Sequence, residues 1–180
     1  DTAAELGAEV LGEVAGPHHR AQRWGVDSET GEEILVENRG GESTLGNLVA
    51  EVQRWATETE EAGSAQIAFM NPGGLRADLT GDPEAELPRP LTYQQAAVVQ
   101  PFANTLVNMQ LTGEQIKTAL EQQWQRDASG DVPSRPFLRL GASAGFTYTY
   151  DPELAEGDRL PGTWLDGEAI ALDASYSVTV

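Results

Sequence analysis

The sequence predicts a protein of the α/β class, because segments with the helical spacing of apolar residues alternate with short strand-like segments along the chain. Residues 44–61 carry the clearest helical pattern, and residues 66–70 end in an apolar run that indicates a buried strand. The length of 180 residues corresponds to one domain, alone or with a leading segment. A domain of that size buries roughly 70% of its unfolded surface, which suffices for a hydrophobic core.

The start of the chain is predicted to form a short helix followed by a strand at residues 9–14. Residues 16–31 are polar and rich in turn-forming residues, so we expect a loop there. The loop contains the adjacent pair His18 and His19. Neighbouring side chains on an extended segment point in opposite directions, so this pair lacks the spacing of metal ligands.

The long predicted helix begins after a polar turn, where Ser43 or Thr44 can accept hydrogen bonds from its first free amides. We expect it to run to about Glu61 and to stop at Gly63. The buried strand at residues 66–70 follows it directly.

The second half of the chain continues the alternation of helices and strands. The expected elements are a surface excursion at residues 81–90, a helix at 93–98 capped by Thr92, a strand at 105–111, a helix at 114–126 with Ile116, Leu120 and Trp124 inward, a loop at 127–136, strands at 137–140 and 145–151, a hairpin turn at Asp166-Gly167, and a last strand at 176–180. The chain ends in that strand, so we expect the domain to be incomplete at its C-terminal end.

The composition makes some classes of partner poor candidates. The chain has 29 acidic and 11 basic residues, for a net charge of −18. Such a surface repels nucleic acid polymers and acidic membranes, although the charge alone indicates only a well-solvated surface. There is no cysteine, so no disulfide or thiolate metal site supports the fold. No apolar run approaches the roughly 20 residues that a membrane-spanning helix needs.

The first candidate binding segment is the loop Asn71–Arg76, which follows the buried strand. Gly73 and Gly74 allow the backbone of this loop to approach a ligand closely. Arg76 then supplies a planar set of donors suited to phosphate or carboxylate, in a protein that carries few other positive charges.

Two further residues could complete a site with this loop. Arg39 stands before Gly40-Gly41 and the start of the long helix, where free amides and the helix dipole favour an anion. Phe102 follows Pro101 and could stack on a base. Together with Asn71, these residues suit a nucleotide or a phosphorylated sugar-like ligand. The alternative is that Phe102 belongs to the core and that the arginines pair with the abundant acidic residues.

Several segments, in their order and spacing, resemble the C-terminal domain of the 5′-nucleotidases, a family that includes UDP-sugar hydrolases and 2′,3′-cyclic phosphodiesterases. The matching segments are Arg39–Leu48, Asn71–Arg76, Gln100–Leu106 and Leu111–Gly113, and residues 145–151 and 176–179 also fit the pattern. The resemblance implies a layered α/β/β/α domain with mixed sheets at residues 34–180. Residues 1–33 would then be a leading segment that contains the end of an interdomain connection and the first strand.

The resemblance also implies a function for the domain. It would bind the base and phosphate of a nucleoside monophosphate or related nucleotide, while a separate N-terminal metallophosphatase domain with two divalent metal ions hydrolyses the ester. By position, Arg39 and Arg76 match phosphate-binding arginines, Asn71 matches a base-contacting asparagine, and Phe102 matches one of two rings that sandwich the base. An extracellular, periplasmic or cell-wall location is implied as well.

The chain departs from the family pattern in three ways. Pro72 stands where the family has a glycine. The second stacking ring and a ribose-binding aspartate belong to a Gly-Gly-Asp segment that would follow Val180. The chain also lacks the histidines and carboxylates of a two-metal centre, so we predict no catalytic or metal-binding residue and no activity for the chain alone. The alternatives are a non-catalytic nucleotide-binding or surface adhesion module that retains the fold, and a surface domain without a ligand.

Overall fold

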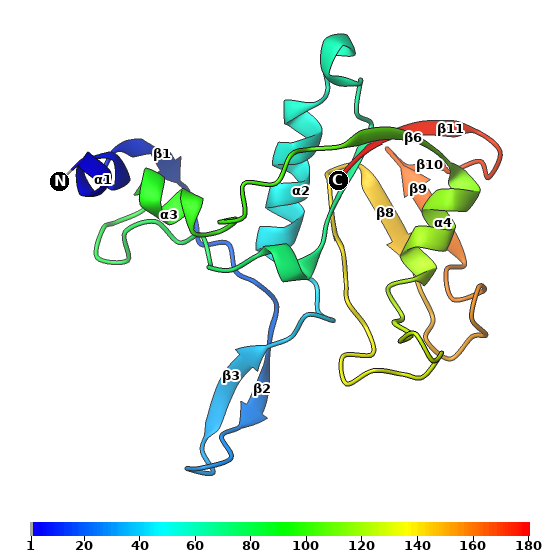
Figure 1. Cartoon of the computed structure of the whole chain (residues 1–180), viewed down its shortest axis with the longest axis horizontal. Coiled ribbons are helices and arrows are strands. Elements are labelled where there is room, and N and C mark those ends of the chain that lie inside the picture. Colours follow the sequence, from blue (N-terminus) through cyan, green and yellow to red (C-terminus); the bar gives the residue numbers. More distant parts are fainter. Residues whose placement is uncertain (1) are drawn as a thin grey trace.

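The structure, a computed structural model, describes residues 2–180 and confirms the α/β class (Figure 1). The helices are α1 (Thr2–Gly7), α2 (Thr44–Ala56), α3 (Tyr93–Ala97) and α4 (Gly113–Glu121), with short 3₁₀ turns η1 (Glu60–Ala62) and η2 (Pro72–Gly74). The strands are β1 (Val10–Val14), β2 (Gln22–Val26), β3 (Glu33–Glu37), β4 (Ile67–Met70), β5 (Arg89–Thr92), β6 (Asn108–Thr112), β7 (Gly141–Ala142), β8 (Phe146–Thr149), β9 (Gly162–Leu165), β10 (Glu168–Ala169) and β11 (Ser175–Thr179).

The central sheet is mixed, with the strand order β6-β11-β4-β7. The last strand, β11, lies between β6 and β4, antiparallel to the first and parallel to the second. Strand β7 pairs antiparallel with the other side of β4, where Met70 faces Gly141. A separate sheet, β10-β9-β8, is antiparallel throughout. Strand β4 is therefore paired with a neighbouring strand along each of its two edges, with β11 at Ile67 and Ala68 and with β7 at Phe69 and Met70.

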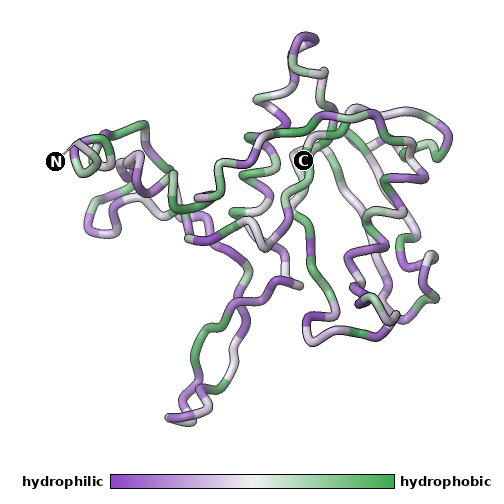
Figure 2. The backbone as a smooth tube through the Cα atoms, in the orientation of Figure 1, coloured by the Kyte–Doolittle hydropathy of each residue, from purple (hydrophilic) through white to green (hydrophobic). Residues whose placement is uncertain are grey.

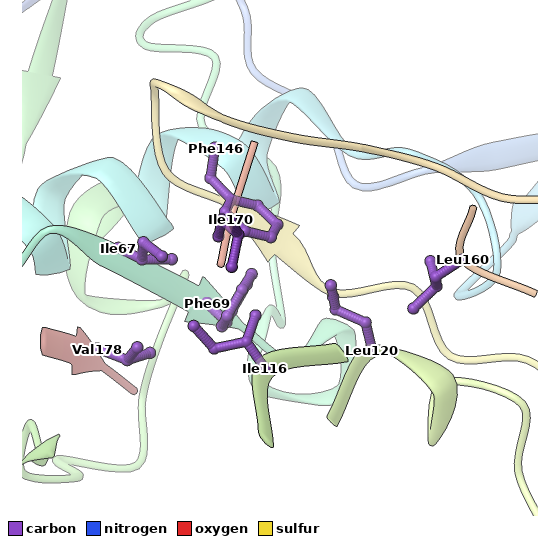
Figure 3. Close-up of a cluster of buried hydrophobic side chains, with 8 residues drawn as sticks. All are labelled: Ile67, Phe69, Ile116, Leu120, Phe146, Leu160, Ile170 and Val178. Carbon is purple, nitrogen blue, oxygen red and sulfur yellow. The ribbon is translucent and has the colours of Figure 1, made fainter. Parts of the chain in front are cut away.

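Strand β4 is buried on both faces, because a hydrophobic cluster lies on each side of the central sheet. On one side, Ile67 and Phe69 pack against α4 and the β8 sheet, and Phe69 meets Phe146 edge to face at 5.1 Å between ring centres (Figure 3). On the other side, Met70 packs against Leu45 and Val49 of α2. Burying large apolar side chains contributes roughly 1.5–3 kcal/mol each, and all four residues of β4 are buried, so packing on both faces holds this strand in place.

Helix α2 begins as the sequence indicates and packs closely on the edge of the central sheet. The Ser43 hydroxyl accepts a hydrogen bond from the Gly46 amide at 2.9 Å, so Ser43 rather than Thr44 is the cap. Gly46 then lies against Gly141 of β7, where a Cβ atom on Gly141 would come within 2.3 Å of the Gly46 carbonyl. Gly141 is needed at this crossing because a side chain there would overlap the backbone of α2, whereas a Cβ atom on Gly46 would lie 3.5 Å from the Gly141 Cα atom.

The leading part of the chain forms two small units beside the main body. Strand β1 pairs with β5, and α1 packs against α3, at the left of Figure 1. Strands β2 and β3 form a hairpin that projects away from the other elements (Figure 1). Figure 2 shows apolar stretches along this hairpin, and Trp24, Val26 and Leu35 are exposed there.

The hairpin contradicts the predicted loop at residues 16–31. Strand β2 occupies residues 22–26 and pairs with β3 over five residues on each side. The prediction is wrong because both faces of this hairpin are largely exposed, so its sequence lacks the alternation of apolar and polar residues that marks a half-buried strand. Strand β3 also crosses the expected boundary between residues 33 and 34.

Two predicted helices are shorter than expected. Helix α2 ends at Ala56 because Thr57 turns its hydroxyl to the Gln53 carbonyl at 2.8 Å and to the Thr179 hydroxyl of β11 at 2.7 Å. The separate turn η1 then leads to Gly63. Helix α4 ends at Glu121, whose carboxylate accepts hydrogen bonds from the backbone of the 157–160 loop. Contacts with distant segments therefore override the helical pattern at both ends.

The strand predicted at residues 137–140 is also wrong. Only Phe137 forms an isolated bridge, with Trp124. The amides of this segment bond to separate groups: Leu138 and Leu140 to the carbonyl and side chain of Gln123, and Arg139 to the Arg39 carbonyl. The pairing with β4 begins only at Gly141.

Other predictions from local signals are confirmed. Thr92 forms a capping box with Gln95 at the start of α3, and the last strand exists as β11. Asp166 and Gly167 join β9 to β10, and both have positive φ angles, 51° and 84°. Two successive positive φ angles are the requirement of a type I′ hairpin turn, which the Asp-Gly pair meets with little strain.

We expect Gly141→Ala to lower the free energy of unfolding by about 1–3 kcal/mol, because the added methyl group forces α2 away from β7. The measurement is urea unfolding followed by far-ultraviolet circular dichroism. Gly16→Ala is the matched control, since a methyl group there meets nothing within 4 Å. Equal stability of the two variants would show that the close crossing of α2 and β7 does not constrain the fold.

Candidate ligand-binding site

The candidate loop leaves the sheet at the end of β4 and turns at once into η2. Pro72 occupies the first position of η2, where its missing amide hydrogen costs nothing. The proline that departs from the family pattern therefore fits the local backbone. The Arg76 amide donates to the Val99 carbonyl at 2.9 Å, so the exit of the loop is attached to the segment after α3.

The two glycines of the loop have different surroundings. A methyl group on Gly74 would lie 2.4 Å from the Met70 Cε atom and 2.9 Å from the Asn71 Oδ1 atom, so a larger residue would force the ends of these two side chains to shift. At Gly73 the nearest atoms would be Asn71 Nδ2 at 3.5 Å and Arg39 Nη1 at 3.7 Å. Gly73 therefore lies between the amide of Asn71 and the guanidinium of Arg39.

Arg39 reaches the loop from the segment between β3 and α2. Its Nε atom donates to Glu37 Oε2 at 3.0 Å, and its side chain is 20% exposed. Its carbonyl accepts from the Arg139 amide at 2.8 Å, which fixes the backbone. The structure thus brings Arg39 and Asn71 together at Gly73, although 32 positions separate them in the sequence.

Arg76 and Phe102 form a second pair at the same loop. The Arg76 Cζ atom lies 5.8 Å from the centre of the Phe102 ring, within the range of a cation–π contact. The side chain of Phe102 is 53% exposed, so this ring is not part of the core. The Arg76 Nη1 atom is 3.5 Å from the Gly73 carbonyl, which leaves the guanidinium weakly held and open to a ligand.

Asn71, Gly74 and Phe102 line the same cavity, which has a volume of about 560 Å³. Its lining is mostly apolar and includes Phe69, Met70, Leu111 and Val178 from β4, β6 and β11. The polar side chains of Asn71, Gln100 and Asn104 also line it. An apolar cavity with a few polar groups at its edge and an exposed ring beside it suits a flat, partly polar ligand.

Ionic contacts connect Arg39 to the far end of the loop. Glu37 lies 3.7 Å from Arg20 Nη1, and the Arg20 backbone amide and Nε atom both donate to Asp78 Oδ1 at 2.9 Å. The His19 Nδ1 atom lies 3.3 Å from the other Asp78 oxygen. Burial would raise the pKa of the Asp78 carboxyl, but the hydrogen bonds from Arg20 and His19 hold the pKa below its ordinary value of 3.8.

Sequence reasoning did not identify Arg20, Glu37 and Asp78 as neighbours of the site. Their residue types carry no signal in a chain with 29 acidic residues, and Arg20 lies in the segment that was expected to be a loop. A weak indication was available for Asp78, which stands two positions after Arg76. The pairing of β2 with β3, which the sequence did not predict, is what brings Arg20 and Glu37 side by side.

Three other residues of the Arg39–Leu48 segment have structural roles. Glu42 pairs with Arg139 at 3.2 Å, Ser43 caps α2, and the Asn47 side chain accepts a hydrogen bond from the Ala142 amide of β7 at 3.1 Å. They attach the start of α2 to the edge of the central sheet. This attachment places Arg39 against the Asn71–Arg76 loop.

The resemblance assigns two metal ions to a separate N-terminal domain and none to this chain. No group of three or more His, Cys, Asp or Glu side chains in residues 2–180 is arranged to hold a metal ion.

None of the helices in residues 2–180 has the length and apolar character that crossing a membrane requires.

Comparison with known proteins shows what the chain resembles. The family described as "5′-nucleotidase, C-terminal domain" matches residues 26–180. The match begins within β2 and includes all six candidate residues.

Among curated relatives, the "Trifunctional nucleotide phosphoesterase protein YfkN" of Bacillus subtilis is 41% identical over 78% of this chain and 9% of its own length. "Endonuclease YhcR" of the same organism is 30% identical over 96% of this chain and 11% of its own. "Cell wall protein Lmo0130" of Listeria monocytogenes is 31% identical over 77% of this chain and 17% of its own. The chain thus spans less than a fifth of the length of each of these relatives.

Among solved structures, a 5′-nucleotidase precursor from Thermus thermophilus superposes with a TM-score of 0.67 at 27% identity. The superposition covers 99% of this chain and 30% of that one. The arrangement of sheets and helices described above is therefore shared with one part of the larger Thermus thermophilus protein.

We expect Asp78→Asn to lower the free energy of unfolding by about 1–3 kcal/mol at pH 7, because hydrogen bonds to a charged acceptor are lost. The pKa of Asp78 is lower in the folded than in the unfolded chain. Its stabilising contribution is therefore complete well above pH 3.8 and is lost as the pH falls through the folded pKa. Urea unfolding at pH 7 and near pH 3.5 should show the difference between wild type and variant shrinking at the lower pH.

Asp158→Asn serves as the control, because Asp158 is an exposed carboxylate in another loop. A difference for Asp78→Asn that is equally large at both pH values would contradict a charge-dependent contact with Arg20 and His19.

Proposed function

The chain belongs to the family of the 5′-nucleotidase C-terminal domain, and from that premise we propose that it is the nucleotide-recognition part of a 5′-nucleotidase-like hydrolase. In this proposal Arg39 and Arg76 bind the phosphate, Asn71 and Phe102 contact the base, and Gly73 lets the phosphate approach the backbone. The observation that carries the proposal is the convergence of these residues on one short loop beside an apolar cavity.

The charge distribution supports an anionic ligand at this loop. Two guanidinium groups border η2 in a protein with a net charge of −18. Within residues 2–180, Arg54 makes hydrogen bonds to two glutamates, whereas the Arg76 guanidinium has only a long contact with the Gly73 carbonyl and a cation–π contact with Phe102. An arginine without a strong partner, in so acidic a protein, is available to bind phosphate with two parallel hydrogen bonds.

The cavity supports a base as the second half of the ligand. Stacking of a base on an aromatic side chain contributes about 1–3 kcal/mol. The exposed Phe102 ring provides such a surface, and the polar side chains of Asn71 and Asn104 line the same cavity. A nucleoside monophosphate carries both the flat ring and the phosphate that this arrangement suits.

Hydrolysis of the ester is assigned to a separate N-terminal metallophosphatase domain of the same polypeptide. Two divalent metal ions in such a domain would activate a water molecule for attack on phosphorus. Residues 34–180 would orient the substrate for this domain, and residues 1–33 would connect the two. A location outside the cytoplasm or at the cell wall accords with the name of the Listeria relative, which is called a cell wall protein.

We expect Arg76→Ala to weaken the binding of AMP by about ten- to a hundredfold, because charged hydrogen bonds contribute about 1.5–3 kcal/mol. Adenosine, which lacks the phosphate, should lose much less affinity. The measurement is an NMR titration of the chain with each ligand. Arg126→Ala is the control, because it removes the same charge from an exposed pair with Glu156 elsewhere on the surface.

The titration has clear negative outcomes. If AMP binds no more tightly than adenosine to the unmutated chain, the proposed phosphate site is wrong. If Arg76→Ala and Arg126→Ala bind AMP equally well, Arg76 is not part of the site. Phe102→Leu tests the base separately, and it should weaken both ligands by a similar factor, because stacking does not involve the phosphate.

We also expect the purified chain to release no phosphate from AMP, with or without added Mg²⁺, Mn²⁺ or Zn²⁺, because residues 2–180 contain no group of side chains arranged for a two-metal centre. A colorimetric phosphate assay measures this directly. Metal-dependent release that follows the protein through successive purification steps would overturn the assignment of hydrolysis to another domain.

A further inference from the structure

The carboxylate of Glu37 lies between two arginines at the end of β3. Its Oε2 atom accepts a hydrogen bond from Arg39 Nε at 3.0 Å, and its Oε1 atom lies 3.7 Å from Arg20 Nη1. Its side chain is 35% exposed, so the contacts are partly shielded from water. One carboxylate thus fixes the positions of two arginine side chains relative to each other.

The contact with Glu37 uses only one edge of the Arg39 guanidinium. A guanidinium has five N–H donors in a rigid plane, and Nε supplies one of them. In residues 2–180 the two Nη groups of Arg39 donate to no other protein group, and Nη1 lies beside Gly73. The Nη1–Nη2 edge that remains can bind a phosphate with two parallel hydrogen bonds.

Arg20 connects this pair to the other end of the candidate loop. Its Nε atom and its backbone amide both donate to Asp78, which follows Arg76 by two positions. The amide of Asn38, next to Arg39, donates to the carbonyl of Ala21, next to Arg20, at 2.8 Å. The backbone segments that carry the two arginines are therefore also hydrogen-bonded to each other. The contacts therefore form a continuous frame from Asp78 through Arg20 and Glu37 to Arg39.

We propose that Glu37 is a positioning residue for phosphate recognition, which holds Arg39 by its Nε atom so that Nη1 lies beside Gly73 and the two Nη groups are left for phosphate. This inference rests on the proposed function, because it assigns a role in orienting an arginine of that site. Arg20 and Asp78 hold Glu37 in place and act through it.

The geometry and the charge of Glu37 have opposite effects, which makes the proposal testable. On charge alone, a carboxylate beside Arg39 lowers the local positive potential and weakens the binding of an anion. As a positioning group, Glu37 orders the Arg39 side chain before the anion binds. Arg39 then loses less rotamer freedom on binding, so the anion binds more tightly. The proposal states that the second effect is the larger.

The test compares the affinity of the chain for AMP and for adenosine by NMR titration. We expect Glu37→Ala to weaken the binding of AMP by about three- to tenfold, since the Arg39 side chain must then be ordered on binding. The affinity for adenosine should stay unchanged. Glu37→Gln keeps an oxygen acceptor for Nε, so it should bind AMP more tightly than the alanine variant. Glu33→Ala, which removes the same charge from the same strand, should behave as the unmutated chain.

Three results would overturn the inference while leaving the proposed function intact. They are AMP affinity in Glu37→Ala equal to or above that of the unmutated chain, an equal loss for AMP and adenosine, and no difference between the alanine and glutamine variants. An unmutated chain that binds AMP no better than adenosine would instead remove the proposed function, and the inference with it.

A second measurement needs no substitution and so does not depend on folding of the hairpin in a variant. In the unmutated chain, the NMR signal of the Arg39 Nε–H group should change little on addition of AMP, because its bond to Glu37 persists. The Nη–H signals should shift strongly. A shift of Nε–H as large as that of the Nη–H groups would overturn the positioning role.

Discussion

The pairing of the last strand with β4 is the constraint on which the rest of the structure depends. Strand β11 lies parallel to β4 through Val178 and Ile67, and its other edge bonds to β6. Thr179 of β11 also bonds to Thr57 at the end of α2, so helix and sheet are fixed relative to each other. Without this strand, β4 would keep only the two-residue pairing with β7, and the Asn71–Arg76 loop would lose its rigid base.

The candidate site combines a rigid part and an adjustable part. The backbone of η2 is held by buried β4 on one side and by the contact of Arg76 with Val99 on the other. The Arg76 and Phe102 side chains are exposed and held mainly by each other. A ligand at this site would meet a fixed turn, which needs no backbone ordering, and two exposed side chains that would lose rotamer freedom on binding.

Excess acidic residues have a structural use near this site. Glu37 and Asp78 order the arginines of the leading segment, Glu42 attaches Arg139, and Glu121 ends α4. A carboxylate that accepts several hydrogen bonds orients its donors more strictly than a neutral group does. The acidic residues thus also contribute to the placement of the positive groups at the candidate site.

The sequence by itself determined the elements that local chemistry specifies: a cap at Ser43 or Thr44, the cap at Thr92, the buried run of β4, the Asp166-Gly167 turn and the loop with its two glycines. It also indicated which residues gather at the loop. Only the tertiary structure decided the exposed β2–β3 hairpin, the early ends of α2 and α4, and the frame that joins Asp78 to Arg39. The physical reason is that these features depend on hydrogen bonds between segments far apart in the chain, such as Thr57 with Thr179, which no local spacing of residues records.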